Sequence, residues 1–313
     1  PSVLYGALRS TYFANHSELF KELTQEKKLN TSEDPTTNLR ITGIYYELLH
    51  DKRNLGPHLP LPRDLVQLKN RDLKELKREK RELTYKVVIL ERCQRNSNYC
   101  SDYVSCSQNI DPLVHSQEVT SLDTGLISIV DYNSYYRTYS NMENILARSI
   151  RDHIVLEPKV GISLNPKTRS SQKHRLYRVG MYRYKGLRLL IQFSGLTLPD
   201  KGIMKLGGEG RAVSYQSRTE NISENISIEE PEKINDGLFK LYLATPAIVE
   251  QGGWLPDSLD PTSLSGSIRG IEVELLAASI GKHRSIGGFD MLTKQPKPMR
   301  QAVPAGSVYY FQA

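Results

Sequence analysis

A run of positive charge is the strongest chemical feature of this sequence. Between Pro158 and Pro199 it contains nine lysines and arginines but no aspartate or glutamate. Surfaces shaped for solubility mix both signs of charge, whereas a field of one sign attracts a partner of the opposite sign. The run therefore predicts binding of a polyanion. Its basic residues are Lys159, Lys167, Arg169, Lys173, Arg175, Arg178, Arg183, Lys185 and Arg188, with His174 among them.

Tyrosines alternate with these arginines, which favours RNA or single strands, because unpaired bases stack on aromatic rings and guanidinium planes. Alternating apolar residues predict two strands, 176–183 and 187–194. The Lys185–Gly186 pair would supply the turn between them. We therefore expect a hairpin with one apolar face and one basic, tyrosine-bearing face.

A glycine-rich stretch, "KLGGEGRAVSY" (205–215), follows the basic run. It matches neither GxxxxGK[ST] nor a GxGxxG that opens a helix, so a mononucleotide site is not indicated. Its glycines precede a strand-like segment, where bare backbone amides could still meet a phosphate and Arg211 would add charge. A simple tight turn is the other interpretation. The residues concerned are Lys205, Gly207, Gly208, Gly210 and Arg211.

The C-terminal part repeats this order of glycines, basic residues and strand. Gly287 and Gly288 are followed by Lys297 and by the strand-like "SVYYF", and His283 and Arg284 precede them. The repetition suggests a duplicated architecture with an equivalent surface in its second copy.

Catalytic patterns are weak in this sequence. The seven histidines are scattered, and neither HExxH nor GxSxG occurs. Metal-independent RNA cleavage would leave His16, His174 and His283 as candidates. Without an orienting partner, a histidine among lysines and arginines more often contacts a phosphate or a nucleobase than it catalyses a reaction. The three cysteines lack a fourth zinc ligand, so we expect no metal and no cofactor, and a reducing compartment.

The length of 313 residues allows two domains, and the composition is typical of a soluble globular protein. No apolar stretch approaches the roughly 20 residues that cross a bilayer, so no membrane partner is expected. Periodicity predicts a helix over 1–13, an exposed helix over 69–82, an irregular proline-rich connection over 55–65, and a helical pattern at the end of 131–150. Strands are expected at 39–48, 84–93, 238–249 and 271–281, and an acidic linker at 219–233.

Several stretches, in order, resemble one family. They are "PSVLYGALRSTYF", "LPLPRDL", "EPKVGISLN", "LYRVGMY", "LGGEGRAVSY", "LATPAI", "IGGFDM" and "PKPMRQAVPAGSVYYF". Together they are similar to the third subunit of the Cmr complex, the type III-B CRISPR effector, within the RAMP superfamily. The resemblance implies an α+β protein of two tandem ferredoxin-like (RRM-like) domains with glycine-rich loops. These would be residues 1–228, with a long insertion at about 40–150, and residues 229–313, C-terminally incomplete. The family's first strand would precede Pro1.

The resemblance also implies a function: a cytoplasmic, non-catalytic RNA-binding subunit in antiviral defence. Such subunits hold the 5′ tag of the CRISPR RNA, and bind the large polymerase-palm subunit and a backbone RAMP subunit. Two alternatives stay open, a RAMP-fold repeat endoribonuclease and the equivalent subunit of a type III-A or III-D complex. The expected RNA contacts are Lys167, Arg169, Lys173, His174, Arg175, Arg178, Arg183, Arg188, Lys205, Gly207, Gly208, Gly210, Arg211, His283, Arg284, Gly287, Gly288 and Lys297.

Overall fold

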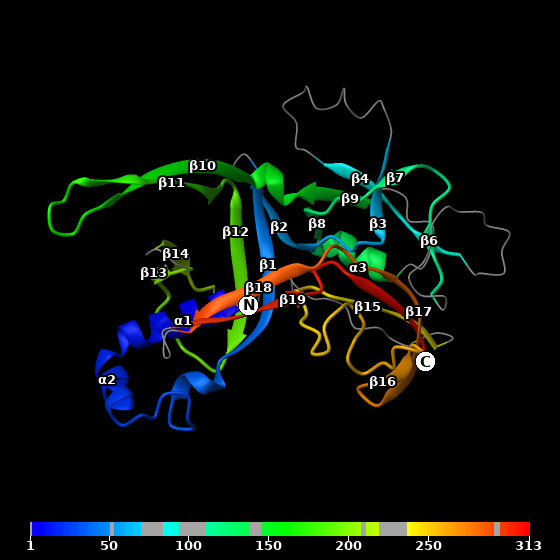
Figure 1. Ribbon diagram of the computed structural model, residues 1–313. Helices are drawn as coiled ribbons and strands as arrows, with labels where there is room; N and C mark the ends of the chain where they lie inside the picture. Colours follow the sequence, from blue (N-terminus) through cyan, green and yellow to red (C-terminus); the bar gives the residue numbers. More distant parts are fainter. Residues whose placement is uncertain are drawn as a thin grey trace.

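The computed structural model describes residues 2–50, 53–69, 84–93, 110–137, 145–207, 211–218, 237–290 and 295–313. The expected helix at 69–82, the acidic stretch 219–233, and Gly208 and Gly210 lie wholly or almost wholly outside these ranges. The described chain is α+β, with few helices and antiparallel sheets (Figure 1). This agrees with the expected fold class, whereas the division into two ferredoxin-like domains stays a prediction.

The chain begins with the helix that its periodicity predicts. In α1 (Ser2–Asn15) Leu4, Ala7 and Leu8 are buried, and the helix packs against the strand β13 (Lys201–Lys205). The next helix, α2 (Ser17–Gln25), occupies a stretch with no clear sequence period. A short 3-10 helix, η1 (Pro35–Asn38), then leads into the first strand, and Asp34 caps it by accepting from the Thr36 backbone.

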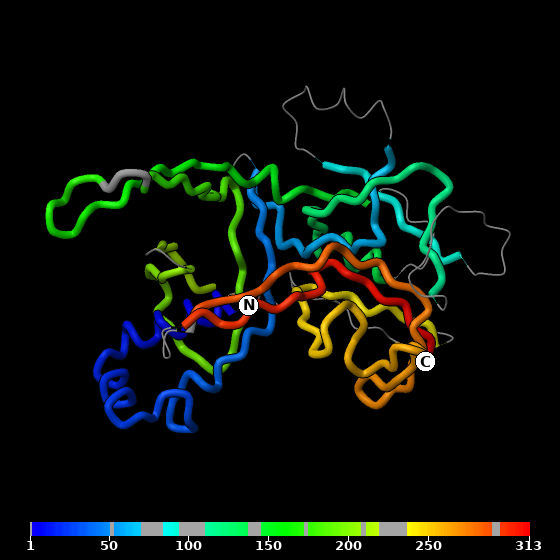
Figure 2. The backbone as a smooth tube through the Cα atoms, viewed as in Figure 1, coloured from blue at the N-terminus to red at the C-terminus, as the bar shows by residue number. Residues whose placement is uncertain are grey.

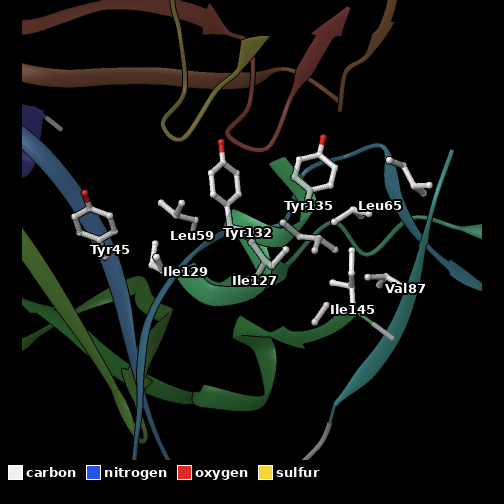
Figure 3. Packing of buried hydrophobic residues seen from close by; sticks show 12 residues of the cluster. Tyr45, Leu59, Leu65, Val87, Ile127, Ile129, Tyr132, Tyr135 and Ile145 are labelled. Carbon is white, nitrogen blue, oxygen red and sulfur yellow. The ribbon is translucent and has the colours of Figure 1, made fainter. Parts of the chain in front are cut away.

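The larger sheet has eight strands in the order β12-β1-β2-β8-β9-β4-β3-β7. Its core holds Leu59, Ile127 and Ile145 beneath Tyr132 and Tyr135 of the helix α3 (Figure 3). The bounds are β1 (Arg40–His50), β2 (Arg53–Pro60), β3 (Leu65–Leu68), β4 (Tyr85–Ile89), β7 (Val119–Thr120), β8 (Gly125–Ser128), α3 (Ile129–Arg137), β9 (Ile145–Ser149) and β12 (Leu187–Ser194). A small pair, β5 (Glu91–Arg92) and β6 (Leu113–Val114), forms a separate ladder, and the Asp111 amide just before β6 donates to the Leu276 carbonyl at 2.8 Å.

The second sheet has four strands in the order β15-β20-β17-β16. These are β15 (Leu238–Tyr242), β16 (Ser265–Ile268), β17 (Ile271–Ser279) and β20 (Val308–Gln312). Leu275, Tyr309 and Phe311 are buried in its own apolar cluster. The strand β20 is central, paired with β15 on one side and β17 on the other.

Three separate hairpins extend from these sheets. They are β10 (Ile154–Leu164) with β11 (Ser171–Tyr184), β13 with β14 (Ala212–Gln216), and β18 (Arg284–Asp290) with β19 (Gln295–Ala302). The 3-10 turn η4 (Ile150–His153) leads into β10. The backbone tube shows the β10–β11 hairpin as a long green arm reaching away from the larger sheet (Figure 2).

The structure corrects several expectations about these elements. The strands predicted at 176–183 and 187–194 exist but do not pair: β11 pairs with β10, and β12 pairs with β1. The proline-rich segment 55–65 is regular strand as far as Pro60. The helix predicted at the end of 131–150 lies at its beginning, and Arg148 belongs to strand β9.

Candidate nucleic-acid interface

The tip of the β10–β11 hairpin presents two of the predicted RNA contacts. Asn165 closes the turn by accepting the Lys167 amide with its Oδ1 at 2.9 Å, and the Arg169 amide donates to the Asn165 carbonyl at 2.8 Å. Arg169 has a φ of 51°, in the left-handed region that disfavours a bulky residue. Lys167 and Arg169 are both exposed at this tip.

The register of the hairpin separates its arginines onto two faces. Directly paired residues point to the same side of an antiparallel ladder, and successive residues alternate. Arg175, Tyr177 and Arg183 therefore share a face with Lys159, whereas Arg178 pairs with Val160 on the opposite face. Arg178 and Tyr182, which alternation placed on the basic face, thus lie beside Val160 and Leu156. Val179 and Met181, which it placed on the apolar face with Tyr177, lie beside Lys159 and Glu157. Lys173 and His174 belong to β11, but their side chains lie outside the description.

An exposed aromatic ring accompanies the basic face. A Cβ on Gly161 would lie 2.2 Å from Tyr177 Cζ, so the Tyr177 ring crosses the strand above this glycine. Further along the same face, Arg183 forms an ion pair with Glu157, which precedes the acid-free run. An exposed tyrosine on the same face as arginines is an arrangement on which a base can stack while its phosphates meet cations.

Arg188 has an acidic neighbour that its local sequence does not reveal. Its Nη1 lies 3.5 Å from Oε2 of Glu47, which is 1% exposed. Arg218 donates to both oxygens of Glu47, at 2.8 and 2.9 Å, and Asn54 donates to Oε1 at 2.8 Å. Burial raises the pKa of Glu47, but the hydrogen bonds from Arg218 and Asn54 and the nearby Arg188 charge outweigh it, and its pKa lies below the ordinary value.

The first glycine stretch is the connection of the β13–β14 hairpin. Gly207 has a φ of +83°, which favours glycine, and the Leu206 amide donates to the Arg211 carbonyl at 3.0 Å. No atom of the described residues lies within 4 Å of a Cβ at Gly207, so on this side the backbone is open to a partner. Lys201 and Lys205 point to the exposed side, while Met204 packs towards α1.

The second glycine stretch differs from the expected loop. Gly287 and Gly288 lie within strand β18, where a β-bulge occurs between Ile286 and Gly288. A Cβ on Gly287 would lie 2.2 Å from Met299 Sδ, so this glycine makes room for a side chain of the paired strand. Gly288 pairs with Lys297, and Arg284 pairs with Ala302. His283 is exposed just before the strand.

The hairpins also carry basic residues that the sequence reasoning left out. Arg300 of β19 pairs with Ile286 of β18 and is exposed, and Lys201 is exposed on β13. The basic run "KPMR" (297–300) was a signal for Arg300. All three hairpins extend towards the left of Figure 1, the side that holds α1 and α2. Apart from Arg188 on β12 and His283 just before β18, the predicted contacts that the structure describes thus fall on three hairpins rather than on one continuous sheet face.

His16, one of the three candidate catalytic histidines, makes local contacts with the end of α1. His16 stacks on Tyr12 with ring centroids 4.2 Å apart, and its Nδ1 donates to the Tyr12 carbonyl at 2.9 Å. Within the described ranges, no group of three or more His, Cys, Asp or Glu side chains could hold a metal ion. No helix in these ranges is long and apolar enough to cross a membrane.

Comparison with known proteins identifies the family. A cryo-EM structure of the type III-B Cmr-beta bound to cognate target RNA is similar over 51% of this chain and 46% of its own, with 20% identity and a TM-score of 0.34. A second, also with AMPPnP (state 1), is similar over 99% of this chain and 76% of its own, with 15% identity and a TM-score of 0.45. The chain thus covers less than half of the first of these relatives. No curated protein matches it. The family model described as CRISPR-associated protein (Cas_Cmr3) matches residues 1–313, and the chain therefore belongs to this family.

Proposed function

We propose that this chain is a non-catalytic RNA-binding subunit of a type III-B CRISPR effector complex, made of two ferredoxin-like domains. It holds the 5′ repeat-derived tag of the CRISPR RNA and contacts the large polymerase-palm subunit and a backbone subunit. The family supports the CRISPR setting. The observation that carries RNA binding is the exposed basic tip and basic face of the β10–β11 hairpin, with Tyr177 beside its arginines.

The residues of the proposed site have different roles, which follow from the chemistry of their side chains. Lys167, Arg169 and Arg175 neutralise phosphates, whose condensed counterions are released on binding. Tyr177 offers a stacking surface to an unpaired base. Lys205, Gly207 and Arg211 at the β13–β14 connection let RNA backbone approach closely. Arg284, Lys297 and Arg300 form the equivalent basic surface on the β18–β19 hairpin.

Fluorescence anisotropy with a labelled, tag-bearing CRISPR RNA tests this function. The double variant Arg169→Glu/Arg175→Glu should bind about tenfold or more weakly, and its dependence of affinity on salt should become shallower. Lys86→Glu/Arg269→Glu is a matched control, because it makes the same change in net charge at exposed sites on β4 and on the β16–β17 turn. Equal losses of RNA affinity in both variants would mean that net charge alone, and not the position of the arginines, determines binding.

A scrambled tag of the same length and composition tests whether the tag itself is recognised. Weaker binding of the scrambled RNA supports tag recognition, and equal binding contradicts it. The endoribonuclease alternative makes its own prediction, specific cleavage of repeat RNA in the presence of a chelator. Cleavage that disappears in His16→Ala would overturn the non-catalytic assignment.

A further inference from the structure

The β10–β11 hairpin has a second face that the proposed RNA site does not use. The pairs Leu156–Tyr182, Val160–Arg178 and Ile162–Leu176 all lie on it. Its large apolar side chains are unusually exposed: Leu156 59%, Val160 60%, Ile162 47%, Leu176 69% and Tyr182 72%. We call these five residues the apolar face.

The apolar face is continuous across both strands. Directly paired side chains in an antiparallel ladder lie about 5 Å apart, so each pair bridges the hairpin. Leu156 also leans diagonally towards Gly180, because a Cβ there would lie 3.0 Å from its Cδ1. A lone two-stranded ribbon is marginally stable in water, and contiguous exposed apolar patches mark interaction surfaces. The exposure and continuity of the apolar face are therefore typical of a surface that a partner covers in an assembled complex.

RNA is a poor occupant for this face. Four of its five side chains are aliphatic and offer neither an aromatic plane to a base nor a charge to a phosphate, so Tyr182 and the neighbouring Arg178 stand among groups unsuited to RNA. Arg175 and Tyr177, the residues of the proposed RNA site, point to the other side of the same ribbon. A polyanion bound there leaves the apolar face uncovered.

Charge complementarity also argues against a second copy of this chain. Contact about a two-fold axis would bring two ribbons together that have no acid from Pro158 to Pro199. Arg178 sits in the middle of the apolar face, opposite Val160, so like charges would be desolvated against each other. Glu157 does not offset this charge, because it lies on the other face and pairs with Arg183. The complementary surface is apolar with a carboxylate.

We propose that the apolar face docks a different protein chain of the same effector complex, one that presents an apolar surface with a carboxylate opposite Arg178. The β10–β11 hairpin then lies between RNA on its basic face and protein on its apolar face. The inference rests on the proposed function in one respect, that the chain works within a complex.

Site-specific photo-crosslinking in the co-expressed complex tests the proposal. The photoreactive residue benzoylphenylalanine replaces Val160 or Leu176, and in a control it replaces Leu146, an exposed apolar residue of β9. We expect positions 160 and 176 to crosslink to one peptide of another subunit, with apolar residues and at least one Asp or Glu. Crosslinks to RNA, to a second copy, within the chain itself, or to nothing would each overturn the proposal.

A pair of matched variants measures the contribution of the face to assembly. Val160→Thr/Leu176→Gln should lower recovery of the crosslinked subunit with the tagged chain about tenfold, because it removes apolar contact without changing charge. Val130→Thr/Leu146→Gln makes the same substitutions at exposed positions of α3 and β9 and should leave recovery unchanged. Equal recovery from both variants would contradict docking at this face.

Charge reversal and RNA binding complete the test. Arg178→Glu should weaken recovery, and a lysine in place of the crosslinked carboxylate should restore it. RNA affinity of the isolated chain is measured in parallel. Normal RNA binding without a protein crosslink rejects this inference alone, whereas a protein crosslink without RNA binding rejects the proposed function alone.

Discussion

Lys240 Nζ lies 3.0 Å from Asp64 Oδ2 and joins the two sheets. Lys240 belongs to β15, and the fully buried Asp64 lies between β2 and β3. Asp64 also accepts from Tyr135 at 2.7 and 2.8 Å and from Tyr310 at 2.6 Å. The ammonium lies 4.6 and 4.8 Å from the centroids of these two tyrosine rings. One carboxylate thus connects the eight-stranded sheet to the four-stranded sheet.

Removing the ammonium should destabilise the protein strongly. Lys240→Met leaves the Asp64 carboxylate buried without its counter-charge, which typically costs about 3–5 kcal/mol. Urea denaturation followed by circular dichroism measures the loss. Lys86→Met, on the exposed side of β4, is the control and should change the free energy of unfolding by less than about 0.5 kcal/mol. Asp64→Asn/Lys240→Met should recover part of the loss because the buried charge is gone; equal values for Lys240→Met and Lys86→Met would contradict this role.

The Glu47–Arg218 pair should make stability depend on acid pH. The pKa of Glu47 is lower in the folded protein than its ordinary value of about 4.3, because the bonds from Arg218 and Asn54 outweigh burial. Its stabilisation is therefore present above about pH 4.3 and is lost as the pH falls through the lower folded pKa. Glu47→Gln should reduce the free energy of unfolding by about 2 kcal/mol near neutral pH, and should flatten the fall in stability towards about pH 3. If the stability of the variant fell as steeply towards acid pH as that of the unmodified protein, the pH dependence would come from other carboxylates.

Two arginines in the same backbone conformation provide a test of the hairpin tip. Arg169 and Arg269 both have left-handed φ values, 51° and 52°, and both are exposed. Glycine should relieve similar strain at each position, so stability should change alike. Arg169→Gly should also weaken tagged RNA binding and reduce the salt slope by about 0.7, the share of one phosphate contact on a single strand. Arg269→Gly should leave RNA affinity unchanged, and a loss of affinity there would indicate that the contact is not specific to the tip.

Gly207 distinguishes a simple turn from a place where RNA backbone comes close. Asparagine tolerates the left-handed φ of +83°, and none of the described parts of the chain has an atom within 4 Å of the added Cβ. Gly207→Asn should therefore keep the β13–β14 hairpin, with a change in stability below about 1 kcal/mol. RNA affinity should fall because the new side chain occupies the approach path. Unchanged RNA affinity would mean that Gly207 serves only to form the turn. Gly56→Asn is the matched control, because Gly56 has a φ of +78° and no described atom lies within 4 Å of a Cβ there.

The comparison of Arg178 with Arg175 shows where local sequence stops being informative. Alternation along 176–183 predicts that neighbouring residues face opposite ways, and the structure agrees. It does not reveal the strand that completes the ladder. β11 pairs with β10, so the side of Arg178 acquires Leu156, Val160 and Ile162. The basic character of a face depends on both strands, and therefore on a pairing that the run of arginines does not encode.

The sequence by itself determined the elements whose signals are local. The apolar spacing of Leu4, Ala7 and Leu8 predicts α1, and alternation predicts β12 and β17, because helix and strand periods are properties of neighbouring residues. The acid-free run likewise determined the sign of the charge on the β10–β11 hairpin. The sequence resemblance pointed to the family that the family model confirms.

The tertiary structure alone decided which distant residues meet. Glu47 receives Arg218 from 171 residues away, and Asp64 receives Lys240 from 176 residues away. The free energy of such contacts comes from burial and from charges brought together by sheet pairing, and neither is present in an extended chain. For this reason the sequence could show how much charge Arg188 carries, whereas the fold was needed to show that a buried carboxylate lies beside it.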